Sequence, residues 1–280
     1  MTVPKNVGVY GGGRMGAGIA HAFLLSGACV TVIEADATAA AAAGDRVAAS
    51  LTKAAERGTL IDSVDQVRDR LTVATDPAEL AGCGLVVEAV PEIVELKTRV
   101  LTRIERFAPD ARLATNTSSL SVDQLSSGLT RPDQFLGLHF FNPVPASELV
   151  EIVVGAKTAA ELVTNAQGWV AALGKTAITV TDSPGFASSR LGVAIAIEAM
   201  RMLEEGVASA EDIDAAMTLG YKHPMGPLRT TDVVGLDVRL AIAEHLASEV
   251  GARFEPPAIL REKIAAGHLG RKTGQGFYSW

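Results

Sequence analysis

The sequence predicts an α/β protein in which a doubly wound, mostly parallel sheet is followed by a smaller all-α domain. Short apolar runs alternate with helical periodicities as far as residue 180, a glycine-rich turn joins the first run to the first helix, and no convincing strand follows Phe186. Alternation of this kind places helices on both faces of a parallel sheet. We expect the boundary near Pro184, with domains of residues 1–184 and 185–280.

The composition is typical of a globular protein, with 280 residues of which 48% are hydrophobic and 20% charged. The net charge of −7 argues against nucleic acid or an anionic membrane as the main partner. No apolar run reaches the ~20 residues that span a bilayer, and no signal peptide is expected. The two cysteines lack metal-ligand spacing, so we predict reduced thiols, a cytoplasmic location and no metal.

The first elements are a strand at 7–10, a helix at 17–26 and a second buried strand at 29–33. Between the first two lies the sequence Gly-Gly-Gly-Arg-Met-Gly, and Glu34 stands at the end of the second strand, 18 residues after Gly16. A glycine motif in this setting is a strong indication of a Rossmann-like dinucleotide site.

Each residue of the motif has a physical role at such a site. Gly11 allows the tight turn, Gly13 lets the backbone approach the diphosphate, and Gly16 lets helix and strand pack closely. The helix start, with Arg14 and Met15, supplies free N–H groups and a positive dipole end. Glu34 is expected to accept from the ribose hydroxyls and to repel a 2′-phosphate, so the predicted cofactor is NAD.

The remaining elements of the first domain continue the alternation. Helices are expected at 36–58, 92–107 and 158–173, and strands at 70–75, 85–90, 113–115, 135–141, 148–154 and 177–180. Ligands bind at the carboxyl ends of parallel strands. Glu92 and Ser118 fall at that edge, and Lys97 lies close enough to reach it.

His139 and Glu151 are the residues that carry the strongest chemical signal. The histidine lies in an aromatic run and the carboxylate in an apolar, β-branched run twelve residues later. A lone histidine in such a place is more often a packing residue, but a buried carboxylate is costly unless something pairs with it. The two are therefore candidates for a general base and the residue that orients it.

The second domain has helical periodicities at 187–205, 210–219, 237–250 and 258–266. It is small and rich in Ala, Leu, Ile and Val. Such a domain commonly buries an apolar face against a second copy, so we expect a homodimer.

Several motifs together make the chain resemble a known family, the short-chain L-3-hydroxyacyl-CoA dehydrogenases, especially the bacterial 3-hydroxybutyryl-CoA dehydrogenase type. The motifs extend over nearly the whole chain and lie at residues 11–16, 87–92, 116–120, 139–143, 182–186, 224–228, 232–237 and 270–278. The resemblance implies NAD-dependent interconversion of a short-chain (S)-3-hydroxyacyl-CoA and the 3-ketoacyl-CoA.

The resemblance also implies roles for individual residues. His139 would take the 3-hydroxyl proton, Glu151 would fix its tautomer, and Ser118 would bind the 3-oxygen of the substrate. Ser50 and Arg57 match positions that meet the adenosine-phosphate end of CoA. The residues expected to contact the cofactor by resemblance are Glu92, Lys97, Ser118, Asn142 and Lys272.

The chain departs from the family pattern at one active-site position, where an asparagine is replaced by Ser189. A serine hydroxyl is shorter than an amide and offers one donor. Three interpretations stay open: Ser189 substitutes adequately, the substrate is shifted, or the chain works slowly on the usual substrate.

Two other functions remain possible at this point. The same chemistry could act on a hydroxyacyl group held by an acyl carrier protein, or on a small free hydroxy acid. A non-catalytic NAD-binding protein is a third class, against which the intact pair of His139 and Glu151 argues.

Overall fold

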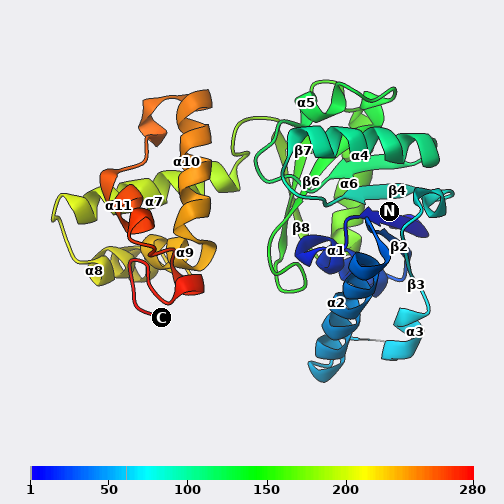
Figure 1. Cartoon of the computed structure of the whole chain (residues 1–280), viewed down its shortest axis with the longest axis horizontal. Helices are drawn as coiled ribbons and strands as arrows, with labels where there is room; N and C mark the ends of the chain where they lie inside the picture. Colours follow the sequence, from blue (N-terminus) through cyan, green and yellow to red (C-terminus); the bar gives the residue numbers. More distant parts are fainter. Residues whose placement is uncertain (1, 61) are drawn as a thin grey trace. The chain divides into compact units, whose positions relative to one another are not determined.

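The computed structural model describes residues 2–60 and 62–280 (Figure 1). It divides into two compact units, Met1–Asp182 and Ser183–Trp280, and the two residues outside the description both fall in the first. The first unit is built on a sheet and the second is helical, so the expected fold class is confirmed. In the described part of the chain, no helix has the length and apolar character needed to cross a membrane.

The first unit contains an eight-stranded sheet in the order β3-β2-β1-β4-β5-β6-β7-β8. Strands β1 to β6 are parallel, β7 is antiparallel to β6, and β8 is parallel to β7. The strand order reverses at β1, so the carboxyl ends of β1 and β4 adjoin where such folds bind ligands. The strands are β1 (Asn6–Tyr10), β2 (Cys29–Ile33), β3 (Leu71–Ala74), β4 (Leu85–Glu88), β5 (Arg112–Thr115), β6 (Phe135–Phe140), β7 (Leu149–Val154) and β8 (Thr176–Thr181).

The helices of this unit are α1 (Arg14–Leu25), α2 (Ala37–Glu56), α3 (Val64–Arg68), α4 (Val94–Phe107), α5 (Val122–Ser126) and α6 (Ala160–Ala172). Helix α1 begins three residues before the expected start, within the glycine motif itself. Helices α3 and α5 were not expected, because five residues are too few to show a helical period.

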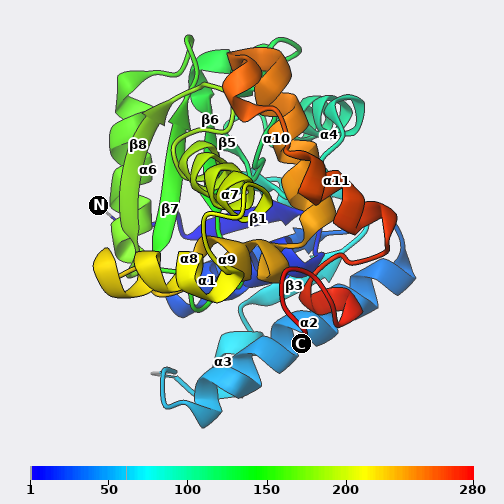
Figure 2. The same ribbon diagram turned by 90° about the vertical axis from the view of Figure 1, so that its left-hand side faces the viewer.

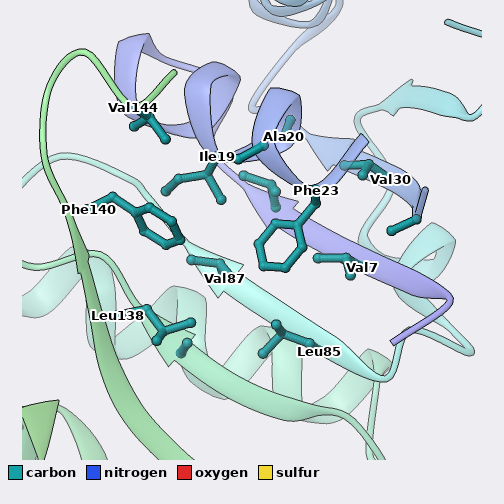
Figure 3. Close-up of a cluster of buried hydrophobic side chains, with 14 of the residues drawn as sticks. Val7, Ile19, Ala20, Phe23, Val30, Leu85, Val87, Leu138, Phe140 and Val144 are labelled. Carbon is teal, nitrogen blue, oxygen red and sulfur yellow. The ribbon is translucent and has the colours of Figure 1, made fainter. Parts of the chain in front are cut away.

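Part of the core lies between α1 and the strands beneath it (Figure 3). Ile19 and Phe23 of α1 are fully buried against residues of β1, β4 and β6. Val7, Val87 and Phe140 are among the partners that Figure 3 labels. Burying large side chains along α1 fixes the helix on the sheet, and with it the glycine turn that begins it.

The second unit consists of α7 (Ser188–Glu204), α8 (Ala210–Ala215), α9 (Pro227–Val234), α10 (Leu236–Val250) and α11 (Ala258–Ala265). Figure 2 shows α7 with the other helices of this unit around it, and each of them contacts it. The expected helix at 210–219 is present, but it changes from α-helical to π-helical at residues 216–220. Helix α9 was not expected, because its Gly-Pro start reads as a loop.

Two buried carboxylates attach the C-terminal tail to this unit. Asp232 accepts hydrogen bonds from the backbone N–H groups of Phe277 and Tyr278 at 2.8 and 2.9 Å. Asp214 accepts from the Tyr278 hydroxyl at 2.8 Å. Burial, followed by the hydrogen bond to Asp214, raises the pKa of Tyr278 well above its usual range.

Candidate active site

The glycine turn between β1 and α1 is closely packed on one side and open on the other. Gly11 has φ +98°, and a Cβ at Gly16 would lie 1.7 Å from the carbonyl oxygen of Gly11. A Cβ at Gly13 would meet nothing within 4 Å. The backbone at Gly13 can therefore be approached by a ligand, while Gly11 and Gly16 admit no side chain. This is the arrangement that a dinucleotide diphosphate requires.

A cavity of about 1330 Å³ lies beside this turn. Gly11, Gly13, Arg14 and Met15 line it, and so does Glu34 at the end of β2. Three arginines of α4 also line this cavity, although the sequence did not single them out: Arg99, Arg103 and Arg106.

Glu34 is fixed against the glycine turn. Its Oε1 accepts a hydrogen bond of 2.6 Å from the N–H of Gly12, and Oε2 accepts one of 3.2 Å from Ala35. Arg46 of α2 donates to the carbonyl of Gly12 at 3.2 Å. The Gly12 peptide is thus held on both sides, which fixes the turn and places the Glu34 carboxylate on the cavity wall.

His139 and Glu151 meet across neighbouring strands. The antiparallel register of β6 and β7 places the two residues directly opposite each other. Nδ1 of His139 lies 2.7 Å from Oε2 of Glu151, with the histidine 6% and the glutamate 0% exposed. An ionised carboxylate can only accept a hydrogen bond, so in the neutral imidazole Nδ1 carries the proton and donates it to this hydrogen bond, and Nε2 is the basic nitrogen.

A second cavity, of about 360 Å³, brings His139 together with residues from other strand ends. Glu92, Ser118 and Asn142, all expected at the site, line it. Asn116 lines it too and accepts a hydrogen bond from the Phe140 backbone at 2.9 Å. Asn116 therefore positions the strand that carries His139.

Glu92 organises the turn that contains Ser118. Its Oε1 accepts from the Thr117 hydroxyl at 2.6 Å and from the Ser118 N–H at 2.8 Å. Burial raises the pKa of Glu92, but the charge of Lys97 and these hydrogen bonds outweigh burial and hold the pKa below its usual value. The ionised carboxylate thus fixes Ser118 at the cavity.

The resemblance predicts that Lys97 contacts the cofactor, and this stays a prediction. Its side chain is fully buried and lines neither cavity. The ammonium lies 2.8 Å from Glu88 and 3.3 Å from Glu92. The ammonium is thus paired with these two carboxylates, and through Glu92 it also influences the site.

A third cavity, of about 640 Å³, is lined by cations of α1 and α2. Ser50 and Arg57, the expected substrate contacts, lie in it with Arg14, Arg46 and Lys53. The spacing of 46, 50, 53 and 57 places these side chains on one helical face, and this signal could have revealed the cluster.

His21 lies on the wall of this third cavity. Its Nδ1 forms a hydrogen bond of 3.0 Å with the Ser50 hydroxyl. Burial, followed by the charge of Lys175, lowers the pKa of His21 to about 4. The ring is therefore neutral near pH 7, and it holds the Ser50 hydroxyl in place.

The three cavities adjoin around the start of α1. Arg14 lines the first and third, Met15 the first and second, and Asn142 the second and third. A dinucleotide and a second phosphorylated ligand can thus occupy neighbouring spaces of the first unit and meet beside His139.

Two expected site residues belong to the second unit. Ser189 is half-buried in the first turn of α7. Lys272 lies in the short turn Arg271–Thr273, and its ammonium is 2.6 Å from the Asp237 carboxylate. Their roles stay predictions from the resemblance.

Two family models match the chain. One describes the NAD binding domain of 3-hydroxyacyl-CoA dehydrogenase and matches residues 6–183. The other describes the C-terminal domain of 3-hydroxyacyl-CoA dehydrogenase and matches residues 185–280. Together they extend over nearly the whole chain.

Individual proteins agree with the family models. A probable 3-hydroxybutyryl-CoA dehydrogenase of Deinococcus radiodurans is 40% identical, with 98% of this chain and 99% of the relative covered. The mitochondrial hydroxyacyl-coenzyme A dehydrogenase of Sus scrofa is 37% identical over 99% of this chain and 91% of its own length. The crystal structure of (S)-3-hydroxybutyryl-CoA dehydrogenase from Ralstonia eutropha superposes with a TM-score of 0.94 at 37% identity, with 99% of each chain covered.

Proposed function

The chain belongs to the 3-hydroxyacyl-CoA dehydrogenase family, and from this premise we propose that His139 is its general base and Glu151 the residue that orients it. The protein is an NAD-dependent oxidoreductase that acts on 3-hydroxyacyl-CoA. The observation that carries the proposal is the buried contact of 2.7 Å between Nδ1 and Oε2 at the edge of a cavity.

Nε2 of His139 accepts the proton of the 3-hydroxyl as the carbonyl forms at C3, and returns it in the reverse direction. Glu151 keeps the neutral ring protonated on Nδ1 and stabilises the imidazolium once Nε2 has taken the proton. Bound NAD supplies the hydride acceptor. The Ser118 hydroxyl forms a hydrogen bond with the 3-oxygen, and Glu92 holds the Ser118 backbone in position.

The residues present fit NAD. Gly13 leaves open space at the helix start, and Glu34 stands on the wall of the same cavity. In our proposal the N–H groups of Arg14 and Met15 meet the diphosphate and Glu34 meets the ribose. Asn142 and Lys272 are the further proposed contacts.

The third cavity supports coenzyme A as the carrier of the acyl group. Arg14, Arg46, Lys53 and Arg57 gather four cations around Ser50. CoA carries a 3′-phosphate and a diphosphate at its adenosine end, whereas the prosthetic group of an acyl carrier protein lacks the adenosine and its 3′-phosphate. A cluster of four cations favours the more highly charged carrier.

We further propose a homodimer that forms through the helical second unit, in a cytoplasmic location. Leu219 is 72% and Tyr221 75% exposed in the segment that follows α8. Exposed apolar residues this close together are typical of an interface. Both cysteines are free thiols, which fits a reducing compartment. Analytical ultracentrifugation of the wild type and of Leu219→Glu tests the dimer, because the variant should sediment as a monomer.

Turnover of one acyl group on three carriers tests the proposed function. NADH oxidation is followed with the 3-ketobutyryl group on CoA, on acyl carrier protein and as the free acid. We expect the CoA thioester to give the highest kcat/KM. No absorbance change with acetoacetyl-CoA at several pH values would contradict the activity, and faster turnover on either other carrier would assign a different substrate.

A further inference from the structure

The second unit contains a buried cation that the reaction described so far does not use. Arg239, in the first turn of α10, is only 9% exposed. Its Nε atom has no hydrogen-bond partner, and in residues 2–60 and 62–280 no carboxylate forms an ion pair with its guanidinium. Burial lowers the pKa of Arg239 below its usual value. An unpaired buried charge is costly, so its presence calls for a counter-charge.

The guanidinium lies against the first turns of α7. A Cβ at Gly192 would be 3.5 Å from Nη1 of Arg239 and 4.0 Å from Nη2. Gly192 follows Ser189 by three residues in the same helix, so the two positions share one face of α7. Arg239 is therefore placed beside the face that carries the departure from the family pattern.

Three properties of the surroundings of the Arg239 guanidinium favour binding of an anion, and of a carboxylate in particular. A guanidinium matches a carboxylate with two parallel hydrogen bonds. Arg239 occupies the fourth position of α10, where the positive end of the helix dipole adds to its charge. The Ser189 hydroxyl on the neighbouring helix face offers one further donor. A neutral thioester oxygen would leave the charge of Arg239 uncompensated.

We propose that Arg239 and Ser189 form a subsite that binds a carboxylate group of the substrate. The proposal rests on the function proposed above, because the resemblance assigns Ser189 to the substrate. The carboxylate has two possible sources. It is either the far end of the acyl chain of a 3-hydroxyacyl-CoA, or the carboxyl group of a free 3-hydroxy acid.

Three substrates distinguish the sources: a 3-hydroxyacyl-CoA with a terminal carboxylate, an uncharged 3-hydroxyacyl-CoA of equal chain length, and the free 3-hydroxy acid. We expect the wild type to prefer one carboxylate-bearing substrate over the uncharged thioester by about 10- to 100-fold in kcat/KM, as one charge-assisted pair provides. Arg239→Leu should abolish this preference. Arg261→Leu removes the same charge from an exposed site and should keep the preference.

Ligand binding gives a second readout that does not depend on turnover. Glutarate should raise the melting temperature of the wild type and of Arg261→Leu, but not that of Arg239→Leu. Equal kcat/KM in the wild type for the charged and uncharged thioesters, with no gain for the free acid, would overturn the subsite. So would a preference or a glutarate shift that survives Arg239→Leu. In each of these cases turnover of the uncharged thioester would still establish the dehydrogenase activity.

Discussion

His139 and Glu151 are register partners on antiparallel strands, and their side chains meet at 2.7 Å in an almost fully buried contact. Side chains directly opposite each other in an antiparallel pair point to the same face of the sheet. The geometry of the pair is therefore fixed by the backbone pairing of β6 and β7, and needs no flexible loop to form it.

Replacing Glu151 by glutamine tests the orienting role. The amide can donate to Nδ1, which would move the ring proton to Nε2 and remove the basic lone pair. We expect kcat to fall by about 10²–10⁴-fold, while the affinity for NADH measured by fluorescence stays within a factor of about three. Glu161→Gln on the exposed side of α6 is the matched control. An equal loss of turnover and of NADH affinity would indicate a damaged fold instead.

Removing Lys97 should destabilise the protein rather than weaken one ligand contact. Lys97→Met leaves the fully buried Glu88 without its cation, although Thr115 still donates to it at 2.6 Å. We expect a loss of about 3–5 kcal/mol in the urea unfolding of the first unit. The double variant Lys97→Met with Glu88→Gln should regain much of this lost stability. Lys157→Met, at the surface, is the control and should lower the free energy of unfolding by under about 0.5 kcal/mol. A loss for Lys97→Met as small as that of the surface control would refute this role.

His21 predicts a pH dependence of stability. Its pKa of about 4 in the folded protein lies below the ordinary histidine value of 6.5. The unfolded chain therefore binds the proton first as pH falls. The contribution of the neutral His21 ring to the free energy of unfolding is therefore complete above pH 6.5. It is lost between pH 6.5 and 4, and the loss is up to about 3 kcal/mol.

Urea unfolding at pH 7.5, 6.0, 5.0 and 4.5 measures this loss. His21→Gln lacks the titrating ring, so its stability should fall less steeply than that of the wild type over this range. Parallel curves for the two proteins would show that His21 is not the group responsible.

Arg57 should act on CoA substrates through their nucleotide end. In Arg57→Met we expect KM for acetoacetyl-CoA to rise about tenfold, as for the loss of one charge-assisted contact. KM for acetoacetyl-pantetheine, which has no nucleotide, should not change. Arg68→Met, an exposed arginine of α3, is the control. An equal rise in KM for both thioesters would show that Arg57 does not act through the nucleotide end of CoA.

The sequence predicted those features of the fold and the site that depend on residues close together in the chain. Apolar runs predicted the eight strands of the sheet, and the spacing from Gly16 to Glu34 predicted a cofactor site. The ion pair between Lys97 and Glu88 was not expected, because Glu88 lies on the strand itself, inside an apolar run. The same limit applies to Arg239, since only packing between two helices reveals that its Nε atom is buried with no hydrogen-bond partner among the described residues.

The most direct test of the account is turnover by His139→Ala with acetoacetyl-CoA, measured together with NADH affinity. Loss of the base should lower kcat by at least about 10²-fold and leave the dissociation constant for NADH within a factor of about three. Turnover within tenfold of the wild type, in a variant that still binds NADH, would contradict the assignment of His139 as the general base.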